Sequence, residues 1–206
     1  MTALNEGLDR IFGQSSFSSL RLLTAPGRVM IPRSATERLV DRALVGLGSE
    51  PARVVDVGSG SGALAVAIAL RAPNAEVWAT DLFEAAVNLT RANVARHGLG
   101  HRVHVVQGDL LEAVPGTFDL VVANLPYLPD RLRLDSAYAD LRSEPTSAVF
   151  APGDGLGPYR RLLEASRRRL TDRGALMIQY RARIFEATRS ELGNLVAELE
   201  EQALAA

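Results

Sequence analysis

A cluster of glycines between an apolar run and a helical pattern is the first part of this sequence suited to chemistry. Residues 54–57 have the character of a buried strand, and three glycines follow before an alanine-rich segment. Glycine lets a ligand approach the backbone, and the first N–H groups of a helix lack partners within the helix. The pattern indicates a nucleoside ligand, with candidate contacts at Asp56, Gly58, Ser59, Gly60 and Gly62.

Two aspartates follow the next two strand candidates and would complete such a site. Asp81 comes directly after residues 76–80, where its carboxylate can accept both ribose hydroxyls, and Leu82 is a neighbouring candidate contact. Asp109 follows residues 103–107, where it can accept the amino group of an adenine while Leu110 packs on the ring. The glycines and Asp81 also fit the looser dinucleotide fingerprint, so these residues leave the choice of cofactor open.

A third group of candidate residues follows the fourth strand candidate, residues 118–123. Asn124, Leu125, Pro126 and Tyr127 come directly after it, and ligands of open α/β sheets bind at the carboxyl ends of strands. This tetrapeptide resembles the Asn-x-Pro-Tyr motif of S-adenosylmethionine-dependent amino-methyltransferases. The resemblance favours S-adenosylmethionine over a dinucleotide as the cofactor and implies that Asn124 contacts cofactor as well as acceptor.

The acceptor implied by this motif is a planar amide or amine. Its nitrogen is a poor nucleophile because the lone pair is delocalised, so the protein must orient it. The side-chain oxygen of Asn124 and the carbonyl of Leu125 can accept the two N–H bonds of a substrate –NH₂. Pro126 would stiffen the loop, and Tyr127 would offer a flat face to the planar group. Orientation of this kind can lower a barrier by several kcal/mol.

The elements that must position these residues alternate between strand and helix patterns. Strands are expected at residues 53–57, 76–80, 103–107, 118–123 and 175–179. Helices are expected at residues 36–47, 62–71, 83–97 and 159–170. The alternation predicts an α/β fold with a mostly parallel sheet. Residues 182–204 have the pattern of a further helix, and no clear sixth or seventh strand follows.

Length and composition are those of one globular domain. The chain has 206 residues, of which 47% are hydrophobic and 23% charged, and these are ordinary values for a globular protein. Residues 1–35 lack a periodic pattern and are expected to form an extended or hairpin-like lead-in. Residues 36–206 are expected to form the catalytic domain.

Composition also limits the sites and partners. The sequence has no cysteine and no lysine, which excludes thiolate metal sites, cysteine nucleophiles and lysine Schiff bases. We expect no metal at His97, His101 and His104, because Gly98 and Gly100 divide them among different elements. A net charge of −1 does not favour nucleic acid or an anionic membrane. Without a long apolar run or a signal peptide, a cytoplasmic location is expected.

Two further segments narrow the resemblance to one family. Residues 29–37, VMIPRSATE, are similar to the LIPRPxTE stretch of the HemK/PrmC type of protein-glutamine N5-methyltransferases. Residues 142–160 are similar to that family's xxEPxxAL…GxDGLxxYR block. The resemblance implies a class I methyltransferase fold with sheet order 3-2-1-4-5 and S-adenosylmethionine as donor. It also implies methylation of a glutamine side chain in the Gly-Gly-Gln loop of a translation release factor.

The same resemblance implies a substrate pocket with contacts from Arg33, Glu37, Glu144 and Arg131. The chain departs from the family pattern at Leu125, which replaces a proline, and the family's helical docking domain is expected to be absent ahead of the catalytic domain. The terminal strand pair of the sheet is expected to be reduced or missing, and an exposed sheet edge there would favour a homodimer. Adenine of nucleic acid, a small molecule, or a non-catalytic scaffold role therefore stay as alternatives.

Overall fold

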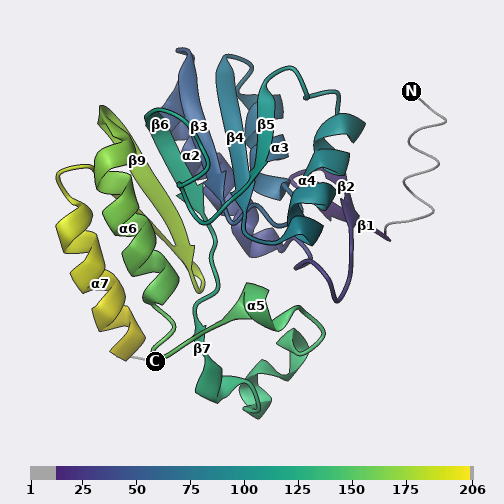
Figure 1. The fold of residues 1–206 in the computed structure, drawn as a ribbon, viewed down its shortest axis with the longest axis vertical. Helices are drawn as coiled ribbons and strands as arrows, with labels where there is room; N and C mark the ends of the chain where they lie inside the picture. Colours follow the sequence, from purple (N-terminus) through teal and green to yellow (C-terminus); the bar gives the residue numbers. More distant parts are fainter. Residues whose placement is uncertain (1–12, 205–206) are drawn as a thin grey trace.

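The centre of the fold is a six-stranded sheet, seen in a computed structural model that describes residues 13–204 (Figure 1). Its strands are β3 (Ala52–Val57), β4 (Ala75–Asp81), β5 (Val103–Gln107), β6 (Phe118–Ala123), β9 (Leu170–Tyr180) and β10 (Arg183–Thr188). They lie in the order β10-β9-β6-β3-β4-β5, with all pairs parallel except β9 with β10. Their apolar runs fit a sheet that is buried on both faces.

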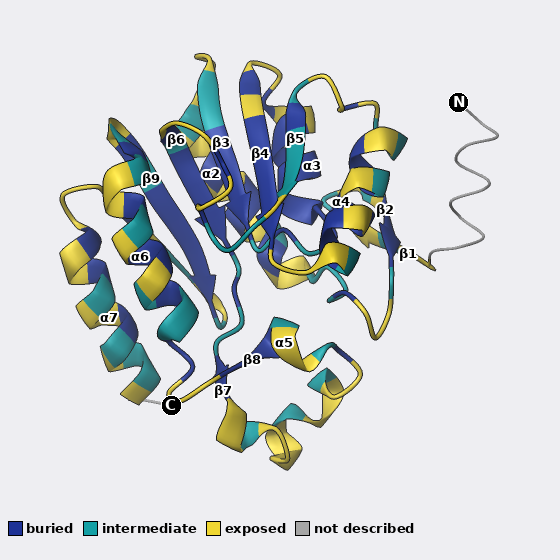
Figure 2. Ribbon diagram, in the orientation of Figure 1, coloured by how far each residue is buried: buried dark blue, intermediate teal, exposed yellow. Residues whose placement is uncertain are grey.

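Helices cover both faces of this sheet. One face packs on α2 (Ser34–Leu47), α3 (Ala63–Arg71) and α4 (Glu84–Arg96), and the other packs on α6 (Gly157–Arg169) and α7 (Leu192–Leu204). Successive side chains of β3 alternate between the two cores, with Val54 in the first and Val55 in the second. Figure 2 shows the central strands buried and the outer sides of the helices exposed.

Two smaller parts lie against this three-layer body. A hairpin of β1 (Gly13–Phe17) and β2 (Leu20–Thr24) packs near α4. The buried Asn93 of α4 holds it, because its side chain accepts the N–H of Leu23 at 2.7 Å and donates to the Leu23 carbonyl at 3.0 Å. The elements between β6 and α6 are β7 (Leu128–Pro129), η1 (Asp130–Leu132), η2 (Ser136–Leu141), α5 (Thr146–Val149) and β8 (Phe150–Ala151).

These short elements form an outer lobe beyond the carboxyl ends of the central strands (Figure 1). β7 pairs in parallel with β8, which ties the two ends of the lobe together. Most of the lobe is exposed (Figure 2). Because the register aligns Val57 of β3 with Ala123 of β6, and Ala123 with Ile178 of β9, three strands end close to this lobe.

The class of fold and the order of its first five strands are confirmed. Starting from β5, the order β5-β4-β3-β6-β9 is the expected 3-2-1-4-5 arrangement. The expected lead-in contains the β1–β2 hairpin, although its first 12 residues lie outside the described residues and its last two belong to α2. No helix among the described residues is both long and apolar enough to cross a bilayer.

The expectation of a helix over residues 182–204 is wrong in its first part. Residues Arg183–Thr188 form β10, which pairs antiparallel with β9. The connecting turn contains Arg181 with a φ of 56° and has no Gly or Asn, so it lacks the usual hairpin signal. The described part of the sheet thus has one strand beyond β9, and β10 occupies the edge from which a homodimer was expected.

Candidate active site

The loop between β3 and α3 is a closely packed part of the candidate site. Gly58 has a φ of 72° and Gly62 a φ of 78°, both in the left-handed region that favours glycine. A Cβ on Gly58 would lie 2.6 Å from a methyl group of Leu125, and one on Gly62 would lie 2.8 Å from a methyl group of Thr90. The loop therefore has no room for side chains at these two positions.

Two buried aspartates fix the ends of this loop. Asp56 accepts the N–H of Ala65 at 3.1 Å through one oxygen, and its other oxygen has no partner among the described residues. Burial raises the pKa of Asp56 to about 7. Asp81 accepts the N–H of Gly60 at 2.9 Å and that of Phe83 at 3.0 Å, and burial raises its pKa as well. Each carboxylate oxygen keeps a lone pair for a further donor.

An ion pair stands at the end of β5. Arg161 of α6 lies 2.6 Å from one carboxylate oxygen of Asp109, which leaves the other oxygen to accept a ligand donor. Leu110, next in sequence, has a φ of 48°, so the backbone turns sharply here. The pairing restricts the directions in which the Asp109 carboxylate can face.

The segment after β6 is held by contacts to two helices. The Asn124 amide donates to the Thr36 hydroxyl of α2 at 3.2 Å, which orients the amide and leaves its oxygen free to accept. The N–H of Leu125 donates to the Tyr159 hydroxyl of α6 at 3.1 Å. Tyr127 packs edge-on against Tyr180, with ring centroids 5.3 Å apart. The first two residues therefore have fixed polar groups at the end of β6.

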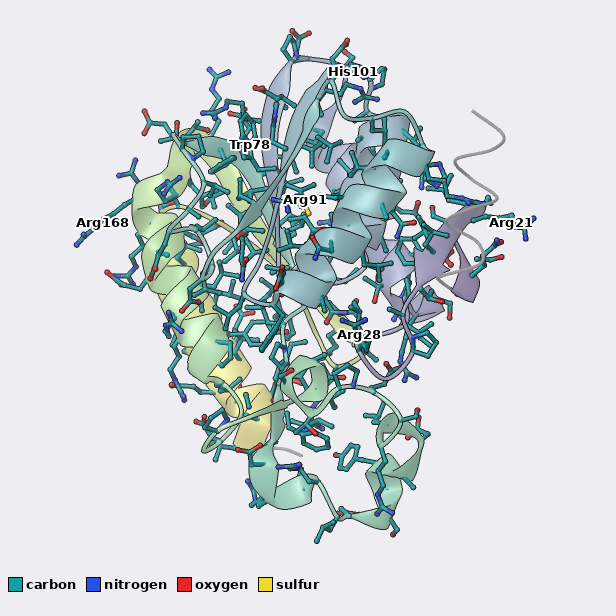
Figure 3. The ribbon with its side chains drawn as sticks, turned by 45° about the vertical axis from the view of Figure 1, so that its right-hand side comes forward. Arg21, Arg28, Trp78, Arg91, His101 and Arg168 are labelled. Atoms are coloured by element: carbon teal, nitrogen blue, oxygen red, sulfur yellow. The ribbon has the colours of Figure 1, made fainter. Side chains whose placement is uncertain are left out.

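A cavity of about 480 Å³ joins these groups. The glycine loop, the ends of β4, β5 and β6, residues 28–33 and part of the outer lobe line it. Glu144, only 9% exposed, ties the lobe to the lead-in by accepting the N–H of Ile31 at 3.2 Å and a guanidinium N–H of Arg33 at 3.1 Å. Arg28 lies on the same rim, below α4 and above the lobe in Figure 3.

A comparison with protein families gives a match over residues 35–141, to the family described as methyltransferase small domain. The chain belongs to this family. It is also 40% identical to a release factor glutamine methyltransferase of Deinococcus radiodurans over 173 residues, which are 84% of this chain and 61% of the relative. The Escherichia coli protein of the same name is 35% identical over 185 residues, 89% of this chain and 66% of the relative.

The chain spans slightly under two thirds of the length of these curated relatives. Among solved structures, a 16S rRNA methyltransferase of T. thermophilus in complex with AdoMet and guanosine matches with a TM-score of 0.57. It is 17% identical, and the match covers 81% of this chain and 41% of that one. A ribosomal protein L11 methylase from Lactobacillus delbrueckii matches with a TM-score of 0.51 and 24% identity, over 86% of this chain and 70% of that one. Both likenesses support the methyltransferase fold.

Most of the site residues predicted from the sequence come together in the cavity. Those that line it are Arg33, Asp56, Gly58, Ser59, Gly60, Asp81, Leu82, Asp109, Leu110, Asn124, Leu125 and Pro126. They arrive from the carboxyl ends of four strands and from the lead-in, as expected for ligands of a parallel sheet.

Five other predicted residues lie outside the cavity lining. Gly62 faces Thr90, and Tyr127 packs on Tyr180. Glu144 accepts a hydrogen bond from the Arg33 guanidinium. Glu37 lies half-buried on α2, and Arg131 is exposed on η1. Arg33 forms an ion pair with Glu144.

Three polar side chains at the site were not predicted from the sequence, namely Thr36, Tyr159 and Arg161. Each belongs to a helix whose position against the sheet is not readable from local pattern. Thr36 and Tyr159 do lie within the two segments that carry the family resemblance, which was the available signal. None of the three histidines lines the cavity, and His101 lies at the opposite end of the sheet from Arg28 (Figure 3).

A pH-dependent stability is expected from Asp56. Since burial raises the pKa of this carboxyl from 3.8 to about 7, the native state binds the extra proton between these values. Its stabilising contribution is full below about pH 4 and is lost as the pH rises through about 7. Asp56→Asn removes this titration and keeps an acceptor for Ala65. The free energy of unfolding of the variant minus that of wild type should therefore be about 2–3 kcal/mol larger at pH 8 than at pH 5.

The measurement is urea denaturation of both ligand-free proteins at the two pH values. An equal difference between variant and wild type at pH 5 and pH 8 would show that Asp56 does not titrate in this range.

Proposed function

We propose that the chain uses S-adenosylmethionine to methylate the side-chain amide nitrogen of a glutamine in a translation release factor. The observation that carries the proposal is the fixed pair of acceptors at the end of β6, namely the Asn124 side-chain oxygen and the Leu125 carbonyl. Both residues line the same cavity as the glycine loop. The names of the relatives at 35–40% identity support this substrate class.

The residues of the cavity fit the cofactor. The glycine loop is a cradle that a Cβ on Gly58 would fill, and the unpartnered buried oxygen of Asp56 is suited to an ammonium group. Asp81 has lone pairs left for the ribose hydroxyls, and the exposed Leu82 offers an apolar surface beside it. The remaining oxygen of Asp109 would accept the amino group of the adenine. When bound, S-adenosylmethionine supplies an electrophilic methyl group on its sulfonium.

The protein's contribution to the reaction is orientation. Because the Asn124 amide N–H₂ is engaged with Thr36, its oxygen can accept one N–H of the substrate amide. The Leu125 carbonyl would accept the other, which holds the nitrogen lone pair toward the cofactor. As the new N–C bond forms and the S–C bond breaks, the nitrogen becomes positive and its proton becomes acidic. No strong base is needed before the transfer.

The first test measures binding and transfer in one preparation. Calorimetry should detect S-adenosylmethionine and S-adenosylhomocysteine but not NADH, which a dinucleotide site would bind. Labelled methyl should then pass to a release factor, and a release factor with the glutamine of its Gly-Gly-Gln loop replaced by alanine should stay unlabelled. Cofactor binding with transfer only to an adenine-containing nucleic acid or a small amine would contradict the proposed acceptor.

A further inference from the structure

The Tyr159 hydroxyl joins the ends of two strands inside the protein. Tyr159 is fully buried on the first turns of α6. Its oxygen accepts the N–H of Leu125 at 3.1 Å, and it lies 2.9 Å from the Leu125 carbonyl oxygen and 2.6 Å from the Gln179 carbonyl oxygen. Leu125 follows β6 and Gln179 lies near the end of β9. One side chain therefore contacts both polar groups of the Leu125 residue.

A hydroxyl has a single hydrogen, and here two carbonyl oxygens compete for it. When the hydrogen points to Gln179, the Leu125 carbonyl is free to accept another donor. When it points to Leu125, one of the two lone pairs of that carbonyl is occupied, and the carbonyl is a weaker acceptor for a further donor. Rotation of the hydroxyl therefore changes the availability of the Leu125 carbonyl without moving any heavy atom.

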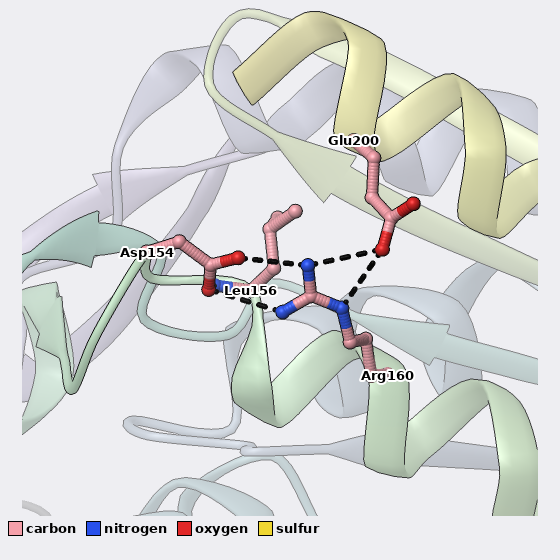
Figure 4. Close-up of polar contacts among 4 residues, drawn as sticks. All are labelled: Asp154, Leu156, Arg160 and Glu200. Carbon is pink, nitrogen blue, oxygen red and sulfur yellow. Dashed lines mark hydrogen bonds and ion pairs between the residues drawn. The ribbon is translucent and has the colours of Figure 1, made fainter. Parts of the chain in front are cut away.

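Charged contacts fix the start of α6, and they therefore restrict the position of the Tyr159 ring. Arg160 donates to both carboxylate oxygens of Asp154 at 3.0 Å and 2.7 Å, and to Glu200 of α7 (Figure 4). The N–H of Leu156 donates to Asp154 at 3.0 Å, which closes the turn before the helix (Figure 4). The ring of Tyr159 also packs edge-on against Tyr180.

We propose that Tyr159 is a positioning residue for methyl transfer. Its hydroxyl holds the Leu125 peptide in place and turns its hydrogen to Gln179 when the acceptor amide donates to the Leu125 carbonyl. This role rests on the proposed function, since it concerns the orientation of the acceptor nitrogen. Without the hydroxyl, the buried N–H of Leu125 and carbonyl of Gln179 each lose a partner, and the end of β6 becomes free to shift.

Tyr159→Phe tests the proposal, with Tyr180→Phe as the matched control. Both variants lose one hydroxyl from a buried ring, but the Tyr180 hydroxyl makes no hydrogen bond within the described residues. Tyr159→Phe should lower kcat at least about tenfold while the KM for release factor and the Kd for S-adenosylhomocysteine stay within about twofold. Tyr180→Phe should leave all three close to wild type.

Amide hydrogen exchange gives a second measurement that needs no acceptor. In ligand-free Tyr159→Phe, the Leu125 amide should exchange faster than in wild type, while the amide of Val121 within β6 stays protected. An unchanged kcat together with unchanged exchange would overturn the proposal. A parallel loss of S-adenosylhomocysteine affinity would also overturn it, because that result indicates a general packing role.

Failure of the proposed function has a different signature. In that case wild type binds S-adenosylhomocysteine but labels no release factor, and kcat is then measured on whichever acceptor is labelled. Exchange at Leu125 still decides whether the hydroxyl holds this peptide, since faster exchange in Tyr159→Phe would support the positioning contact and unchanged exchange would refute it.

Discussion

Asn124→Ala should lower kcat for methyl transfer at least about 100-fold while the affinity for S-adenosylhomocysteine changes by less than about threefold. The substitution removes the oxygen that orients the acceptor amide, and it leaves the glycine loop, Asp81 and Asp109 intact. It also removes the donor to the hydroxyl of Thr36, a buried residue that lines the same cavity. Turnover with labelled cofactor and calorimetric affinity are the two measurements.

The matched control is Asn88→Ala, at an exposed position of α4 away from the cavity lining. It should keep both turnover and affinity. Full turnover of Asn124→Ala would contradict the proposal that the Asn124 side-chain oxygen orients the acceptor amide.

The second large effect is expected from Asp81→Asn. The carboxylate accepts two backbone N–H groups and, by the proposed function, the ribose hydroxyls of the cofactor. An amide has one acceptor oxygen in place of two and carries no charge. One backbone N–H therefore loses its acceptor, and the ribose hydroxyls lose a charged acceptor. The Kd for S-adenosylhomocysteine should rise by about 10–100-fold, since each lost factor of ten corresponds to about 1.4 kcal/mol.

Asp119→Asn separates this effect from a loss of stability. The Asp119 carboxylate also accepts a backbone N–H, from Arg53 at 2.9 Å, and a hydroxyl, from Thr171 at 3.0 Å. It does so near the start of β6, outside the cavity lining. Both variants should have a lower melting temperature, but only Asp81→Asn should bind the cofactor more weakly. Equal affinities in the two variants would mean that Asp81 only supports the loop.

The sequence predicts the parts of the fold in which local pattern and tertiary structure agree. The parallel strands are rich in Val and Ala, and β3, β4 and β5 end at or just before a Gly or Asp, so both signals are local. β10 was missed because Arg181 and Ala182 form its turn without typical turn residues. The outer lobe was missed because long-range contacts, such as those of Glu144 with Ile31 and Arg33, hold its short elements in place.

The residues of the candidate site also divide into those predictable from local pattern and those placed by long-range packing. Asp81, Asp109 and Asn124 directly end or follow parallel strands, and parallel strands end at one edge of a sheet, so their convergence is predictable from sequence order. Thr36 and Arg161 come from helices that reach this edge only through packing. Tyr159 lies 34 residues from Leu125, and nothing in its local sequence indicates that its hydroxyl faces that peptide.

The contact between Gly58 and Leu125 links the variation allowed at two distant positions. With 2.6 Å between a Cβ at Gly58 and the Leu125 methyl group, a lineage that acquires alanine at the first position must shift or shorten the side chain at the second. The reverse order carries no such cost, because a smaller residue than Leu125 fits over glycine. Substitutions at these two positions should therefore be correlated among descendants of this chain, and changes at Leu125 should come first.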